Sequence, residues 1–262
     1  MKLRHELKYA VSLEHASQLF KALESYCVPD PFAGEEGSYE VASLYYDTQD
    51  FRFYWDREES VGYRRKIRLR SYNSKGKSTG VFLEIKEKHK NLVAKKRIPV
   101  PLSVFEGVPN QSRLLLNHVI DQLHDSAESR EVRYLHRALQ LQPITIVRYV
   151  RDTLMSGRDN GLRITYDRRL TTGGENLFQF DRIGESFIHP AASGILEIKA
   201  NSGIPLWLKS IMSDYGFFQS RFSKYCLAVK CLHKLPSRRI PSAPEQAPAI
   251  DESPVLRGVG GM

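Results

Sequence analysis

Short stretches in which apolar and polar residues alternate dominate the first 235 residues, and this alternation is typical of β-strands with one buried face. The pattern predicts strands at 3–10, 39–46, 62–72, 80–88, 92–100, 144–155, 162–170, 178–180 and 194–200. Apolar residues at helical spacing predict helices at 13–26, 51–57, 114–123, 128–140, 206–214 and 220–233. We therefore expect an α+β domain, mostly antiparallel sheet with helices at its periphery.

The organisation of the chain follows from its length and from a change of composition near its end. With 262 residues it has room for one large domain or two small ones, and its composition is that of a globular protein. Residues 236–262 are rich in Pro, Ser and Gly and lack an apolar period. We expect one domain over residues 1–235, followed by a disordered tail over residues 236–262.

Charged residues fall on one face of several predicted strands. The strand at 62–72 alternates Ile67 and Leu69 with four cations, namely Arg64, Lys66, Arg68 and Arg70. Glu6 with Lys8, Glu84 with Lys86, and Glu197 with Lys199 share faces in the same way. One interpretation is an ordinary sheet whose charged face is solvated. The other is a closed barrel with a charged interior and helices outside.

The acids on this charged face admit two interpretations as well. In a closed barrel, Glu6, Glu84 and Glu197 would serve as ligands of Mg²⁺ or Mn²⁺, which prefer carboxylate oxygens. Glu84 could equally form an ion pair with Lys86 or with an arginine across the sheet.

The charge of the chain indicates a polyanionic partner. It has 39 Lys and Arg against 30 Asp and Glu, a net charge of +9. Residues 62–100 hold 13 basic residues and two acids, so this segment carries the whole excess. Such a segment attracts polyphosphate, nucleotides, nucleic acid or acidic lipids.

The remaining composition excludes several classes of protein. Three cysteines without a CxxC pair argue against a disulfide framework and a structural zinc site, so we expect no disulfide partner. No apolar run reaches 18 residues, and the charged N-terminus is unlike a signal peptide. We therefore expect a cytoplasmic protein.

Six short motifs occur in a fixed order along the chain. They are RHELKY at 4–9, IRLRSY at 67–72, FLEIK at 82–86, YVR with LRITYD at 149–151 and 162–167, ILEIK at 195–199, and FSKY at 222–225. In order and spacing they resemble the VTC domain, the polyphosphate polymerase module of the triphosphate tunnel metalloenzyme superfamily, over roughly residues 1–233. Arg4 stands where the superfamily pattern ExExK has its first Glu, which agrees with the VTC branch. The chain is similar to the bacterial stand-alone type.

The resemblance implies a closed antiparallel β-barrel, the triphosphate tunnel fold, and a set of site residues. Its catalytic residues would be Lys8, Arg68, Arg70, Lys86, Arg151, Arg163 and Lys224. Further phosphate ligands would be Lys95, Arg97, Lys199, Arg221 and Ser223, although Lys96 could face inward in place of its neighbours. Glu197 and Glu6 would hold Mn²⁺ or Mg²⁺. Arginine forks and lysine point charges suit a triphosphate, which needs several donors to replace its water.

The activity implied is that of a metal-dependent polyphosphate polymerase, which transfers the γ-phosphate of ATP to a growing chain inside a basic tunnel. One alternative is a tunnel triphosphatase that hydrolyses inorganic or nucleoside triphosphate, and another is a non-catalytic polyphosphate-binding module. The expected partners are ATP or triphosphate and polyphosphate. Nucleic acid is not expected, and any coupling to transport would require a separate membrane partner.

Overall fold

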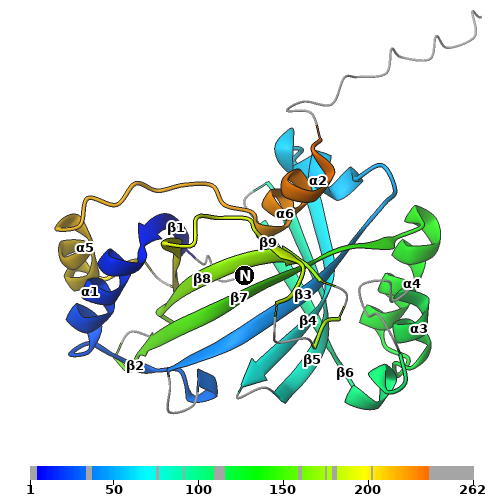
Figure 1. The fold of residues 1–262 in the computed structure, drawn as a ribbon, viewed down its shortest axis with the longest axis horizontal. Helices are drawn as coiled ribbons and strands as arrows, with labels where there is room; N and C mark the ends of the chain where they lie inside the picture. The colour runs from blue at the N-terminus through cyan, green and yellow to red at the C-terminus, as the bar shows by residue number, and fades with distance from the viewer. Residues whose placement is uncertain are drawn as a thin grey trace, which may run out of the picture.

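The computed structural model describes residues 5–33, 37–74, 77–90, 92–108, 116–158, 161–174, 176–178, 182–201 and 203–235 (Figure 1). The predicted tail at 236–262 lies outside the described residues. Within the described part, no helix is long and apolar enough to cross a membrane.

One antiparallel sheet forms the framework of the molecule, as the alternating pattern predicts. Its strand order is β1-β10-β8-β7-β3-β4-β5-β6, with β2 paired to β7 and β9 paired to β8. The strands are β1 (His5–Ser12), β2 (Cys27–Pro29), β3 (Ser38–Asp47), β4 (Tyr63–Ser74), β5 (Lys77–His89), β6 (Leu92–Val100), β7 (Gln142–Ser156), β8 (Arg163–Gly173), β9 (Glu185–Phe187) and β10 (Ser193–Ala200).

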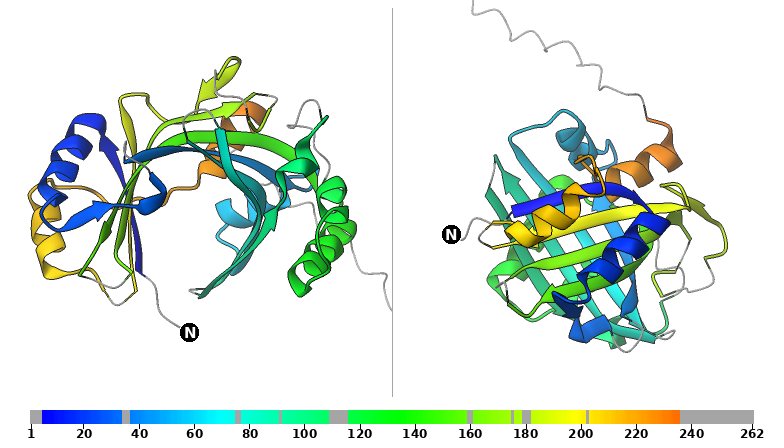
Figure 2. Two further views of the ribbon diagram at one scale, coloured as in Figure 1. Left: turned by 90° about the horizontal axis from the view of Figure 1, so that it is seen from below. Right: turned by 90° about the vertical axis from the view of Figure 1, so that its left-hand side faces the viewer.

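The sheet bends into an arch (Figure 2). Strands β1, β10 and β8 form one wall, β4, β5 and β6 form the other, and β7 and β3 lie between them. The edge strands β1 and β6 are not joined by a backbone ladder in the described ranges. Instead, Lys86 Nζ of β5 reaches Glu6 Oε2 of β1 at 3.9 Å, so side chains rather than backbone bonds bring the two walls together.

Helices cover the outer, convex face of both walls, because most apolar residues of the wall strands point outward. Outside β4 and β5, buried Ile67, Leu69 and Leu83 pack against α3 (Leu116–Asp121) and α4 (Ala127–Leu139). Outside β1 and β10, one core cluster joins these strands to α1 (Leu13–Leu23) and α5 (Leu206–Ser213). The alternation of these strands therefore turns most of their charged residues to the inner, concave face.

Helices α2 (Arg52–Glu58) and α6 (Lys224–His233) pack together at one end of the arch (Figure 1). Asp47, at the end of β3, is fully buried and joins them. Its carboxylate accepts hydrogen bonds from the backbone N–H groups of Phe53 and Tyr54 in α2 and from the Tyr225 hydroxyl of α6, at 2.9, 3.0 and 2.5 Å. The first turn of α6 is thereby placed against the inner face.

Several elements differ from the prediction. The helix expected at 13–26 ends at Leu23, and the short strands β2 and β9 were not predicted. The helix expected at 220–233 begins only at Lys224, because Ser223 caps it and residues 219–220 pair with the free edge of β1. There the backbone N–H of Ser220 donates to the carbonyl of Lys8 at 2.9 Å. Phe178, expected to begin a strand, lies in a turn whose Leu177 carbonyl accepts from Arg148 at 3.0 Å. Residues 179–180 of that predicted strand lie outside the described residues.

Candidate active site

The inner face of the arch collects cations from six strands and from α6. Most of the residues that the sequence motifs indicate lie here, and carboxylates hold them in groups. The residues in question are Lys8, Arg68, Arg70, Lys86, Lys95, Arg97, Arg151, Lys199 and Lys224. The prediction that charged strand faces meet in one interior is confirmed, and the solvated half-exposed sheet is not what the chain forms.

Glu84 of β5 is the centre of the first group and is 1% exposed. Arg68 of β4 and Arg97 of β6 stand opposite it in the strand registers, and their guanidinium groups contact its carboxylate at 2.7 and 2.8 Å. Lys95 Nζ lies at 2.7 Å and Arg70 Nε at 3.7 Å. Burial raises the pKa of Glu84, but the charges of Arg70, Arg68 and Lys95 outweigh burial and hold the pKa far below its usual value.

This arrangement settles two points that the sequence left open. Glu84 forms ion pairs with neighbouring cations, so it is engaged as their common counter-charge. On β6, Lys95 and Arg97 face inward, whereas Lys96 faces outward and forms ion pairs with Glu87 of β5 and Glu131 of α4.

Asp167 of β8 is the centre of the second group, and it is fully buried. Arg151 of β7, its partner in the strand register, binds both carboxylate oxygens at 2.6 and 2.8 Å. Lys224 Nζ of α6 contacts the same carboxylate at 2.6 Å. Burial raises the pKa of Asp167, but Arg151 and Lys224 outweigh burial and lower it to about 2. The sequence analysis missed Asp167, although its spacing of two and four residues from Thr165 and Arg163 places all three on one strand face.

Glu6 and Glu197 form the third group, on the neighbouring strands β1 and β10. Lys8 Nζ lies 2.7 Å from a Glu6 oxygen and 3.5 Å from a Glu197 oxygen, and Lys199 Nζ lies 2.9 Å from Glu197. Burial raises the pKa of Glu197, but Lys199 and Lys8 outweigh burial and hold the pKa well below its usual range.

The chemistry of this third group fits a divalent cation. Glu6 and Glu197 both contact Lys8 Nζ, so the two carboxylates lie close together on the same face. The described residues contain no group of three or more His, Cys, Asp or Glu side chains that could enclose a metal. Mg²⁺ is commonly held by one or two carboxylates together with substrate phosphates and water, so a pair of carboxylates on a phosphate-binding face suits it.

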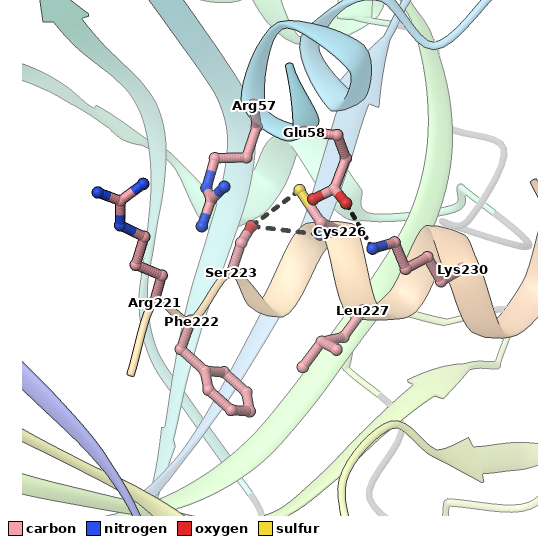
Figure 3. Close-up of a pocket in the computed structure, with 8 residues that line it drawn as sticks. All are labelled: Arg57, Glu58, Arg221, Phe222, Ser223, Cys226, Leu227 and Lys230. Carbon is pink, nitrogen blue, oxygen red and sulfur yellow. Dashed lines mark hydrogen bonds and ion pairs between the residues drawn. The ribbon is translucent and has the colours of Figure 1, made fainter. Parts of the chain in front are cut away.

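Three predicted residues lie apart from these groups. Arg163 forms an ion pair with Asp30 at 2.7 Å and a hydrogen bond with the Tyr39 hydroxyl at 2.9 Å. Ser223 caps α6 by accepting from the backbone N–H of Cys226 at 3.3 Å, and its hydroxyl also accepts from Lys66 Nζ at 2.7 Å. Arg221 lines a pocket between α2 and α6 (Figure 3).

Tyrosines supply a further set of polar contacts that sequence reasoning did not identify. Arg68 donates to the Tyr45 hydroxyl at 2.8 Å, and Arg97 donates to the Tyr72 hydroxyl at 2.6 Å. Burial raises the pKa of Tyr45, but Arg68 and Arg70 outweigh burial and lower it to about 8. The signal in the sequence was weak, because a tyrosine on a strand is more often a packing residue.

The inner face as a whole is cationic, since its lysines and arginines outnumber the acids that pair with them. Cations held in place by buried acids are preorganised, so the binding of a polyanion does not require these side chains to be ordered first. The arrangement can bind a chain of phosphoryl groups and neutralise charge that develops upon it.

A family model described as the VTC domain matches residues 3–233. The chain belongs to the VTC domain family. This match confirms the family that the six motifs indicated. None of the curated proteins compared with the chain matches it significantly.

Several solved structures of low sequence identity resemble the VTC chain. HpAC1 from Hippeastrum, described as a candidate adenylyl cyclase with a dominant triphosphatase activity, is 17% identical, with a TM-score of 0.49 over 92% of this chain and 98% of that one. The candidate adenylate cyclase bh2851 from Bacillus halodurans is 13% identical, with a TM-score of 0.48 over 85% of this chain and 94% of that one. PH1819 from Pyrococcus horikoshii OT3 is 12% identical, with a TM-score of 0.45 over 87% of this chain and 99% of that one.

Proposed function

We propose that this VTC domain is a polyphosphate polymerase that uses ATP as phosphoryl donor, with the inner face of the arch as its active site. The observation that carries the proposal is the convergence of cations from six strands and α6 on one face, in a chain of this family. A binding surface for a compact anion would need two or three such residues. An array that extends over both walls suits a linear chain of phosphates.

In the proposed reaction, a terminal oxygen of the polyphosphate chain attacks the γ-phosphorus of ATP. The bond between that phosphorus and the β–γ bridging oxygen breaks, and ADP leaves with the electron pair. The chain grows by one phosphoryl group. No protein nucleophile takes part, so the enzyme has only to align the reactants and neutralise charge.

The groups of the inner face would bind different phosphates, according to their positions. Arg68, Arg70 and Arg97 converge on Glu84, so an incoming phosphate can replace the carboxylate as a bidentate partner of each guanidinium. Arg151 of β7 and Lys224 of α6 share Asp167 and would hold a phosphate from the middle of the arch. The charge developing on the leaving ADP is stabilised by cations already in place.

Glu6 and Glu197 are the residues that would hold Mg²⁺ or Mn²⁺. When bound, the ion would supply Lewis-acid polarisation and charge neutralisation at the phosphate oxygens. Lys8 contacts both carboxylates and Lys199 contacts Glu197, and these two lysines hold the pKa of Glu197 well below its usual range.

The test is an incubation with ATP and Mn²⁺, followed by a gel stained for polyphosphate and an assay of free phosphate. We expect a ladder of chains together with ADP from the unchanged protein. Arg68→Ala and Lys224→Ala should abolish the ladder without unfolding, because Glu84 keeps three other cations and Asp167 keeps Arg151. Lys96→Ala is the matched control, since this lysine on the same wall faces outward.

The outcomes separate the alternatives. Free phosphate without a ladder would replace the polymerase by a triphosphatase acting at the same residues. Binding of polyphosphate without either product would leave a binding module. Full activity in both Arg68→Ala and Lys224→Ala would show that the inner face is not the active site.

A further inference from the structure

The pairing of β4 with β5 places like charges directly opposite each other at one end of the inner face. In the register, Arg64 stands opposite Lys88 and Lys66 stands opposite Lys86, whereas the next pair, Arg68 and Glu84, is complementary. Like charges in directly opposed positions destabilise a sheet. Two such pairs in succession therefore indicate that these cations have a role other than stabilising the sheet.

Internal acids do not neutralise this end of the array. Among the described residues, no ion pair within 4 Å involves Arg57, Arg64, Lys66, Lys88 or Arg221. Asp56 raises the pKa of Arg64 and Glu6 raises that of Lys88, but in both cases burial and neighbouring cations outweigh the acid. The cations at this end therefore differ from those around Glu84 and Asp167, which share a buried carboxylate on the same face.

A pocket adjoins these unneutralised cations. It lies between α2 and α6, and Arg57 and Arg221 line it on one side of the N-terminal turn of α6 (Figure 3). The two arginines and the strand residues form one cluster, because burial and the charges of Arg57 and Arg221 lower the pKa of Arg64, and burial, Arg64 and Arg221 lower that of Lys88. Ser223, which also lines the pocket, accepts from Lys66 on the inner face and so connects the two regions.

We propose that Arg57, Arg64, Lys88 and Arg221 form an outer anion site that holds the distal phosphoryl groups of a linear polyphosphate whose end lies on the inner face. The proposal rests on the function proposed above and adds a determinant of chain length to it. Arg64 and Arg68 lie four residues apart on β4, about 13 Å along the strand. A ligand must extend along the strand to contact both, which a chain longer than triphosphate does.

The test compares two probes on one variant. The double variant Arg64→Gln and Lys88→Gln removes two half-buried cations that form no ion pair with another described residue, so the fold should persist. Calorimetric titration with tripolyphosphate and with a size-selected medium-chain polyphosphate measures both affinities. We expect the affinity for the longer chain to fall about tenfold, with the affinity for tripolyphosphate changed less than about twofold.

The matched control is the double variant Arg65→Gln and Lys96→Gln, which removes the same charge from the outward side of β4 and β6. It should change neither affinity by more than about twofold, because long-range attraction alone is weak at physiological salt. The outer site is refuted if both probes lose affinity alike, if neither does, or if the control loses as much for the longer chain. Absence of tripolyphosphate binding by the unchanged protein would instead refute the proposed function, and the outer site with it.

Discussion

Asp167→Asn is the substitution that most directly tests how the inner face is built. The carboxylate is fully buried and serves two cations at once, Arg151 through two bonds and Lys224 through one. Asparagine keeps the size of the side chain and removes its charge. The buried Arg151 and the partly buried Lys224 are then left without this counter-ion at the junction of β7, β8 and α6.

The size of the effect follows from the ion pair and from the pKa. Removing one partner of a buried pair costs roughly 3–5 kcal/mol of unfolding free energy. The pKa of Asp167 falls from 3.8 to about 2, because Arg151 and Lys224 outweigh burial, and this fall corresponds to about 2 kcal/mol at neutral pH. Since the folded-state pKa is depressed, this stability is present above about pH 4 and is lost as the pH falls towards 2.

Urea unfolding of both proteins, at neutral pH and between pH 5 and 3, measures the effect. We expect Asp167→Asn to lose roughly 3–5 kcal/mol at neutral pH and to depend less on acid than the unchanged protein. Asp152→Asn is the matched control, because Asp152 binds Arg168 at 2.8 Å across the same two strands but is partly exposed. It should lose less than about 1 kcal/mol.

Added tripolyphosphate supplies a second measurement on the same variant. The unpaired Arg151 and Lys224 should bind the anion, so tripolyphosphate should stabilise Asp167→Asn more than it stabilises the unchanged protein. If Asp167→Asn unfolds like Asp152→Asn and gains nothing extra from the anion, the inner face does not depend on its internal acids and the reasoning is wrong.

Two further predictions concern titration and metal. Burial lowers the pKa of Lys66 and of Lys95 to about 8, and Arg68 and Arg70 outweigh burial to lower that of Tyr45 to about 8. The inner face therefore loses positive charge as the pH rises, and the affinity for tripolyphosphate should fall about tenfold between pH 7 and 9. Lys66→Arg should make this pH profile shallower in calorimetric titrations, and a slope equal to that of the unchanged protein would contradict a contribution from Lys66. Glu197→Gln should raise the Mn²⁺ concentration needed for half-maximal activity about tenfold or more. Metal-free tripolyphosphate should bind this variant at least as tightly as the unchanged protein, because Lys8 and Lys199 lose an internal partner. A loss of affinity for both Mn²⁺ and tripolyphosphate would indicate a purely structural role.

Much of the site was predictable because strands alternate. A period of two assigns each residue to a face without knowledge of the partners, so Arg68 and Arg70 could be placed together, away from Ile67 and Leu69. The order of the six motifs then indicated the family, and the family match over 3–233 agrees. The choice between Lys96 and its neighbours was not made in this way, because the start of β6 lacks clear apolar alternation. Contacts with Glu87 of β5 and Glu131 of α4 show which way Lys96 points.

The sequence by itself determined the long strands, the faces of most of their charged residues and the cationic excess, because these depend on local period and composition. The short strands β2 and β9 have too few residues to show a period. Only the tertiary structure decided which acids neutralise which cations. Asp167 meets Lys224 because Asp47 and Tyr225 position α6, and these contacts join residues far apart in the chain. The same is true of Arg57 and Arg221, which share a pocket only because α2 packs against α6. Pairing of this kind depends on the path of the whole chain in space, which no local pattern contains.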